Sequence, residues 1–214
     1  MPRWLWLMLI GILGALWWVG HRSAAPLAAV PLATGVVDTC PPAPWYSNAN
    51  EPRQSEVAGR IPPFRLGDAT VLPLAGFSLE ARVLSREDYS IGTEADYSPT
   101  DLALGWGPMS EPGMAERLNV SQGGRFYRYS WGSEGPPIDP GLIIRNSANM
   151  HMVPADRNVA QALARVDAGD IVRLNGWLIR IDRDNGWHWQ SSLTREDSGA
   201  GACEVVYVCS IATK

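Results

Sequence analysis

Hydrophobic and polar residues alternate in several stretches of the C-terminal part of the chain, with the period of two that is typical of β-strands. Residues 77–83 alternate without interruption between an apolar and a polar face. Residues 171–181 and 203–211 are longer runs rich in β-branched residues, which favour strands. Asn185-Gly186 predicts a tight hairpin turn before a returning stretch at residues 187–193. These stretches predict a mainly β domain.

Between these strands the pattern predicts further extended segments and one helix. Residues 125–131 carry aromatic side chains on one face and predict a second strand, and residues 142–144 with 149–153 predict a third extended segment. Residues 98–104, inside a stretch rich in proline and glycine, are predicted to begin a short helix. Apolar residues at helical spacing follow Asp156, whose carboxylate can cap the free amides of a first helical turn.

The resulting order is strand, strand, strand, helix, strand, strand, with one more strand at the end. This order fits an OB-like, partly open β-barrel, in which a helix lies between the third and fourth strands. Related small mixed barrels have a similar order and fit as well. The fold class expected from the sequence is therefore mainly β with one helix, following an N-terminal transmembrane helix.

The most apolar stretch, Trp4–Gly20, has 17 residues without a charge. This length is at the short end for a membrane span, which needs about 20 residues. Tryptophans lie at both of its ends, and indole rings prefer the headgroup level of a bilayer. A cleaved signal peptide is the alternative, with Arg3 as its basic start and Ser23-Ala24-Ala25 as the cleavage site. We expect the uncleaved anchor, because Pro26 would directly follow that cut.

The chain is therefore predicted to have three parts: an anchor at residues 1–22, a tether at 23–75 and a β-barrel-like globular domain at 76–214. Proline recurs along the tether, where it disfavours both helix and central strand. The positive charges around the apolar run favour an N-terminus inside the cell. We thus expect a single-pass protein of a bacterial inner membrane, with its C-terminal domain in the periplasm.

The charge balance and the motifs exclude several classes of function. The net charge is −4 and the isoelectric point is near 5.4, whereas a general nucleic-acid-binding protein presents a basic surface. Nucleic acid is therefore not expected as a partner. The three histidines lack the spacing of a metal site, and the sequence contains no phosphate-binding or hydrolase motif. We expect no metal and no cofactor.

The chain contains three cysteines, Cys40, Cys203 and Cys209. On one straight strand Cys203 and Cys209 would lie roughly 20 Å apart, which is too far for a disulfide. A disulfide in an oxidising compartment would therefore join Cys40 to one of the other two. The alternative is that all three are reduced.

Aromatic and basic residues provide the candidates for ligand binding. Trp106 lies in a glycine-rich loop, which can expose an indole ring for stacking on a sugar, a base or a peptide ring. The alternative is a tryptophan that plugs the open end of the barrel. The other candidates lie on the two aromatic stretches predicted as strands: Arg125, Tyr127, Trp187 and Trp189.

A catalytic interpretation centres on His151, because imidazole titrates near neutral pH and can act as a general base. Its nucleophile would be Cys203 or Ser192, and Asn149 and Arg195 would assist. The spacing does not require this arrangement, since triads are set by space and not by sequence. The alternative is a polar network that pins a long loop by side-chain hydrogen bonds.

Four stretches, taken together, resemble a group of bacterial proteins that have a single N-terminal membrane anchor and no known activity. They are SREDY (85–89), DLALGWGPMS (101–110), SANMH (147–151) and SSLTREDSGAGACE (191–204). The resemblance carries no reaction over to this chain. Two hypotheses follow: a tethered domain that binds a protein partner in the cell envelope, and a hydrolase of an envelope polymer or peptide.

Overall fold

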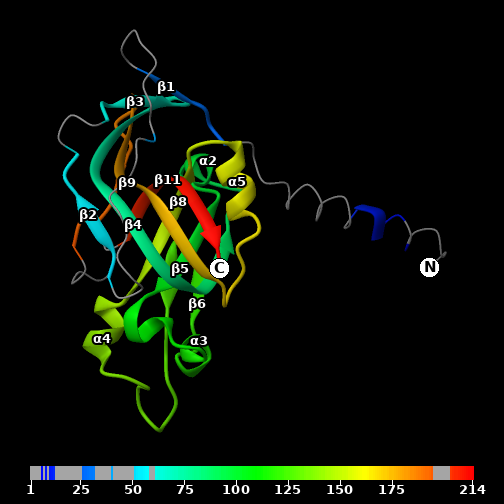
Figure 1. Cartoon of the computed structure of the whole chain (residues 1–214). Helices are drawn as coiled ribbons and strands as arrows, with labels where there is room; N and C mark the ends of the chain where they lie inside the picture. The colour runs from blue at the N-terminus through cyan, green and yellow to red at the C-terminus, as the bar shows by residue number, and fades with distance from the viewer. Residues whose placement is uncertain are drawn as a thin grey trace.

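The computed structural model describes residues 6, 8, 10–12, 26–31, 40, 51–57, 61–194 and 203–214. Over these residues the protein is mainly β, with one large sheet and a separate two-stranded sheet (Figure 1). The large sheet contains β1 (Ala29–Pro31), β2 (Arg53–Ser55), β3 (Phe64–Leu66), β4 (Ala69–Asp88), β5 (Thr100–Gly105), β8 (Ser147–Pro154), β9 (Ile171–Arg183), β10 (His188–Gln190) and β11 (Glu204–Thr213).

The remaining elements are short. The second sheet is the hairpin of β6 (Ser121–Gly123) and β7 (Phe126–Arg128). The helices are α2 (Thr93–Tyr97), the 3₁₀ turn η1 (Gly107–Ser110), α3 (Met114–Arg117), α4 (Pro140–Arg145) and α5 (Arg157–Leu163). In Figure 1, β1 and β3 lie at one end of the molecule and α3 and α4 at the other.

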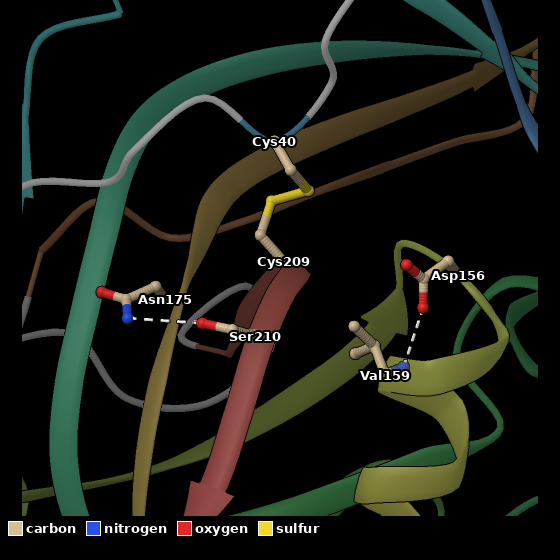
Figure 2. The surroundings of a disulfide bond; sticks show 6 residues. All are labelled: Cys40, Asp156, Val159, Asn175, Cys209 and Ser210. Atoms are coloured by element: carbon tan, nitrogen blue, oxygen red, sulfur yellow. Dashed lines mark hydrogen bonds between the residues drawn. A yellow bond between two sulfur atoms is a disulfide. The ribbon is translucent and has the colours of Figure 1, made fainter.

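Five strands of the large sheet, β4, β5, β8, β9 and β11, form a ring, because each pairs with two others of this set. β4 pairs with β5, β5 with β8, and β9 with both β4 and β11, all antiparallel. The ring is completed by β8 and β11, which run parallel. Helix α5 connects β8 to β9 and begins at Asp156, whose carboxylate accepts a hydrogen bond from the Val159 amide at 2.9 Å (Figure 2). This helix and its cap confirm the sequence prediction.

Residues at alternating positions of the ring strands face a common apolar interior. One fully buried residue from each strand shows this: Leu79, Leu102, Met150, Leu174 and Val206. The outward face of the ring is buried as well where β3 covers it. There, residues of β3 pack with Trp177 of β9 and Tyr207 of β11 in a second apolar cluster. Several ring strands are therefore buried on both faces.

Burial on both faces explains one wrong prediction. The stretch 98–104, expected to begin a helix, contains most of β5, and all six residues of that strand are buried. A strand covered on both sides does not alternate between apolar and polar residues. The helix in this part of the chain is α2, which ends just before the stretch at Tyr97.

The extended segment expected at residues 142–144 is also wrong, because these residues belong to helix α4. Asp139 caps this helix by accepting hydrogen bonds from the amides of Gly141 at 2.8 Å and Leu142 at 3.3 Å. Pro140 occupies the first turn, where its missing N–H is not needed. The stretch 125–131 is shorter as a strand than expected and pairs only with β6.

Part of the stretch expected as a tether belongs to the sheet. β3 and the first residues of β4 pair with each other, and β4 pairs with β9 from Ala69 onward. Pro73 is accommodated inside β4 because the pairing register shifts between Pro73 and Ala75, where a β-bulge removes the need for a donor. The folded part of the chain therefore begins before residue 76.

Most of the apolar run Trp4–Gly20 lies outside the described residues, and its prediction as an anchor stays a prediction. Within the part of the chain that the structure describes, no helix combines the length and the apolar character needed to cross a bilayer.

A disulfide joins Cys40 to Cys209, with 5.4 Å between the two Cα atoms (Figure 2). This confirms the prediction that Cys40 pairs with one of the other two cysteines. Cys209 lies where the register between β11 and β9 shifts, between Val208 and Ser210. The bond connects the N-terminal part of the chain to the last strand across a sequence separation of 169.

Candidate functional site

Polar residues gather on the outward face of β5 and β8, opposite the apolar interior. Asp101 on β5 faces His151 on β8 in the strand ladder, and Asn149 lies two residues before His151 on the same face. All three are buried. They point outward because Leu102 and Met150, their chain neighbours, occupy the interior.

The Asp101 carboxylate is the centre of this group. Its Oδ1 lies 2.6 Å from Nη1 of Arg125, and its Oδ2 lies 3.0 Å from Nδ1 of His151. Asn149 donates a third contact from Nδ2 to Oδ2 at 3.3 Å. A buried carboxylate is tolerated only when it is paired and hydrogen-bonded in this way. The Asp101 side chain itself is completely shielded from solvent.

Arg125 reaches Asp101 from the turn of the β6–β7 hairpin. Gly124 and Arg125 form this turn with φ angles of +61° and +70°, as a two-residue hairpin of type I′ requires. A left-handed backbone costs a non-glycine residue about 1–2 kcal/mol. The strained residue is held by its backbone, whose N–H donates to Tyr89 Oη at 3.0 Å and whose carbonyl accepts from Asn149 Nδ2 at 3.0 Å.

Two aromatic rings flank the Arg125 side chain. The guanidinium carbon lies 3.8 Å from the ring centroid of Tyr89 and 5.7 Å from that of Trp189. Cations over aromatic faces are attracted by the ring quadrupole within about 6 Å. The side chain of Arg125 therefore lies between two aromatic rings and against a carboxylate, and these three residues, Asp101, Tyr89 and Trp189, are called the Arg125 pocket. Burial raises the pKa of the Tyr89 hydroxyl above its usual value, and the hydrogen bond from the Arg125 amide opposes this only in part.

A row of rings continues from this pocket along the β9–β10 hairpin. The Trp189 ring lies 4.6 Å from the His151 ring and 6.3 Å from Trp187. Trp187 in turn stacks on Tyr97 of α2, with 5.8 Å between centroids and 15° between planes. Trp187 and Trp189 are only half-buried, so the row offers aromatic faces near the molecular surface.

The contact between the β6–β7 hairpin and the ring leaves several buried polar atoms incompletely bonded. Gln122 donates from Nε2 to Asn149 Oδ1 at 2.7 Å, but its own Oε1 has no hydrogen-bond partner among the described residues. The same holds for Nη2 of Arg125. His151 Nδ1 lies 3.0 Å from Asp101 Oδ2 but without the alignment of a hydrogen bond. Unsatisfied buried polar atoms are rare in native proteins and call for an explanation.

Tyr127 secures the far side of the hairpin. Its Oη lies 2.5 Å from Oγ of Ser147, which also donates to the carbonyl of Ile143 at 2.6 Å. Burial raises the pKa of Tyr127 to about 12, with a smaller opposing contribution from the Ser147 hydroxyl. Tyr127 therefore acts as a neutral hydrogen-bonding group that fixes the hairpin to β8 at neutral pH.

The structure places one predicted ligand-binding residue in the core. Trp106 is 1% exposed and packs in the interior cluster of the ring, so its ring does not lie open on a loop as the stacking hypothesis requires. The glycines around it allow close packing: a Cβ at Gly105 would lie 2.6 Å from the backbone oxygen of Met109. Of the other candidates, Arg125 lies near the Trp189 ring, Trp187 lies 6.3 Å from Trp189, and Tyr127 contacts Ser147 on β8.

The candidate catalytic residues are only partly brought together. His151 and Asn149 both contact Asp101. Cys203 donates from Sγ to the Arg125 carbonyl at 3.8 Å, and Ser192 Oγ donates to the carbonyl of Thr194 at 3.3 Å. Arg195 lies outside the described residues.

Sequence reasoning missed three members of the site: Asp101, Tyr89 and Gln122. Asp101 was hidden because β5 does not show strand alternation. Tyr89 and Gln122 lie in the turn-rich stretch 85–124, where only the tertiary fold shows which side chains meet. Within the described residues, no group of histidine, cysteine, aspartate or glutamate side chains is arranged to hold a metal ion.

Comparisons with known proteins do not assign this chain to a family. No protein-family model matches the chain, and no curated protein and no solved structure is detectably similar to it.

Proposed function

We propose that the protein is a membrane-tethered binding domain that recognises a protein partner in the cell envelope. The binding surface is the β9–β10 hairpin with the half-buried rings of Trp187 and Trp189, which lies beside the buried polar group of β5 and β8. The observation that carries this proposal is the continuous row of rings from Tyr97 through Trp187 and Trp189 to His151. Half-buried aromatic side chains at such positions are typical of binding surfaces, since they offer a large contact area at low entropic cost.

The strand pairings support an OB-like, partly open barrel as the scaffold. The ring runs from β4 through β5, β8, β11 and β9 back to β4. Helix α5 connects β8 to β9, which are the third and fourth of these strands in chain order. Proteins with an OB-fold bind ligands on the face of their second and third strands and on the flanking loops. In this chain those strands are β5 and β8, which carry Asp101 and His151.

The disulfide between Cys40 and Cys209 supports a location outside the cytoplasm, because disulfides persist in oxidising compartments. The apolar run Trp4–Gly20, as an uncleaved anchor, would then hold the domain at the outer surface of a bacterial inner membrane. The proposal includes this anchor and a periplasmic domain.

The proposal is tested by replacing the exposed part of the row. We expect Trp187→Ala with Trp189→Ala to remove the partners that cross-link to the full-length protein in its native membrane. Trp131→Ala is the matched control, since Trp131 is 39% exposed and, among the described residues, stacks on Tyr129 alone. An unchanged set of cross-linked partners in the double variant, with the fold retained, would show that this surface does not bind them.

A hydrolase is the second candidate, and the contact between Asp101 and His151 is the observation that favours it. Enzymes with a histidine general base use a carboxylate in this position to orient the imidazole. Cys203 or Ser192 would supply the nucleophile. A cysteine- or serine-directed covalent probe should then label the domain, and His151→Ala should abolish the labelling. Labelling no greater than that of the denatured protein would exclude this candidate.

A further inference from the structure

The pocket around Arg125 has the chemistry of a site for a guanidinium group. The side chain pairs with a fully buried carboxylate, that of Asp101, at 2.6 Å. Its planar group lies over the Tyr89 ring and near the Trp189 ring. A carboxylate and aromatic faces in this arrangement match the planar, weakly hydrated guanidinium better than the compact, strongly hydrated ammonium of lysine. The buried negative charge also disfavours an anionic ligand.

The hairpin that delivers Arg125 contacts the ring through the hydrogen bonds of Gln122, Arg125 and Tyr127 and through the packing of the Tyr127 ring. Among the described residues it pairs with no strand of the large sheet. Its turn places Arg125 in the left-handed region, and Gln122 Oε1 and Arg125 Nη2 are buried without a hydrogen-bond partner among the described residues. A two-stranded hairpin is only marginally stable by itself. Asp101, Tyr89 and Trp189 thus surround an arginine whose backbone is strained and whose Nη2 has no hydrogen-bond partner among the described residues.

We propose that this pocket is an arginine-recognition site that the chain's own β6–β7 hairpin occupies, and that an arginine side chain of the partner protein takes the place of Arg125. This inference rests on the proposed binding function and adds the chemistry by which the partner is recognised. The partner presents its arginine in an extended segment. The half-buried rings of Trp187 and Trp189 extend the contact from the pocket along the β9–β10 hairpin.

Emptying the pocket tests the proposal directly. In the full-length protein, Arg125→Gly removes the guanidinium and suits the turn, because glycine adopts a φ near +70° without strain. The probe is the capped tripeptide acetyl-Gly-Arg-Phe-amide, which has the sequence of residues 124–126. Its matched control is the same peptide with lysine in place of arginine. Binding is measured by titration calorimetry.

We expect the Arg125→Gly protein to bind the arginine peptide saturably, about tenfold or more tightly than the wild type binds the same peptide. We also expect the variant to bind the arginine peptide about tenfold or more tightly than it binds the lysine peptide. Adding Tyr89→Leu to the Arg125→Gly protein should then weaken the binding. The proposal fails if the folded Arg125→Gly protein shows no saturable binding. It also fails if the wild type and the Arg125→Gly protein bind the arginine peptide with equal affinity, or if the variant binds the lysine peptide as tightly as the arginine peptide. It fails too if adding Tyr89→Leu to Arg125→Gly does not weaken the binding of the arginine peptide.

The near-ultraviolet circular dichroism spectrum establishes that each variant is folded. If Arg125→Gly does not fold, Arg125→Asn replaces it under the same criteria, since asparagine also tolerates the left-handed region. Failure of these titrations would leave the cross-linking test of Trp187 and Trp189 untouched. Loss of cross-linked partners combined with no arginine binding would therefore overturn only this inference and not the binding function.

Discussion

Asp101 and His151 face one another across the β5–β8 ladder, with Nδ1 of the imidazole 3.0 Å from Oδ2 of the carboxylate. Both side chains are almost completely buried, with exposed fractions of 0% and 3%. Arg125 closes the group from the β6–β7 hairpin. The same carboxylate therefore stabilises two neighbouring strands and fixes the segment that lies over them, so that stability and the proposed recognition depend on one side chain.

The first prediction concerns this carboxylate. Asp101→Ala should lower the free energy of unfolding by about 3–5 kcal/mol, because it leaves the buried Arg125 without its counter-charge and removes the polar group that faces His151. Urea denaturation followed by tryptophan fluorescence measures the loss. Asp184→Ala is the control: Asp184 is 87% exposed and lies 3.6 Å from Arg65, so its loss should change stability by less than about 1 kcal/mol. Equal losses in the two variants would contradict the role given to Asp101.

A second prediction concerns the close approach of β9 and β11. A Cβ atom at Gly176 would lie 2.0 Å from the backbone oxygen of Tyr207, and backbone in the middle of the ring cannot move away cheaply. Gly176→Ala should therefore cost about 3 kcal/mol or more. At Gly186 a Cβ meets open space, and only its φ of +88° is unfavourable, so Gly186→Ala should cost about 1–2 kcal/mol. Thermal unfolding of the two variants should show this order, and the reverse order would contradict the packing described.

The third prediction concerns the disulfide. Its loop spans 169 residues of sequence, and the chain-entropy model assigns such a cross-link about 5 kcal/mol of stability as an upper figure. Reductant or Cys40→Ala should therefore lower the urea midpoint of the oxidised protein. Cys203→Ala should respond to reductant as the wild type does, since Cys203 is outside the disulfide. A midpoint that does not change on reduction would mean that the bond contributes nothing to stability.

The elements that sequence reasoning found are those in which local signals and tertiary environment agree. Asp156 caps α5, and the hairpin turn at Asn185-Gly186 directly follows β9. The local pattern failed where tertiary packing covers both faces, as in β5. At α4 the capping signal of Asp139 and Pro140 was present in the sequence but was outweighed by the β-branched residues that follow.

The site shows the same contrast between what local sequence signals indicate and what only the tertiary fold decides. His151, Arg125 and Trp189 could be chosen because their side chains carry recognisable chemistry. Their contact with Asp101 and Tyr89 depends on the register between β5 and β8 and on the position of a hairpin far along the chain. Register is a non-local property, so no spacing in the sequence could indicate it. The sequence left Trp106 open between an exposed ring and a plug of the barrel for a related reason, since its glycine neighbours permit close packing as readily as exposure.

The last prediction concerns acid stability and the ion pairs of Glu80. This carboxylate lies 2.5 Å from Nε of Arg173 and 2.7 Å from Nζ of Lys214. Burial by itself would raise the pKa of Glu80, but the hydrogen bonds from Lys214 and Arg173 outweigh it and hold the pKa below the ordinary 4.5. Because the folded pKa is depressed, the stabilisation is fully present above about pH 4.5 and is lost as the pH falls through the folded value.

Glu80→Gln should accordingly cost about 1 kcal/mol at neutral pH, a modest figure because Arg173 and Lys214 are 42% and 47% exposed. The difference from the wild type should shrink as the pH falls below about 4.5, since the wild-type carboxyl then becomes neutral as well. Urea denaturation at a series of pH values measures this convergence. Glu134→Gln, at an exposed position, should follow the wild-type curve throughout. A gap between Glu80→Gln and wild type that stays constant into the acid range would show that the ionised form of Glu80 is not favoured by its partners.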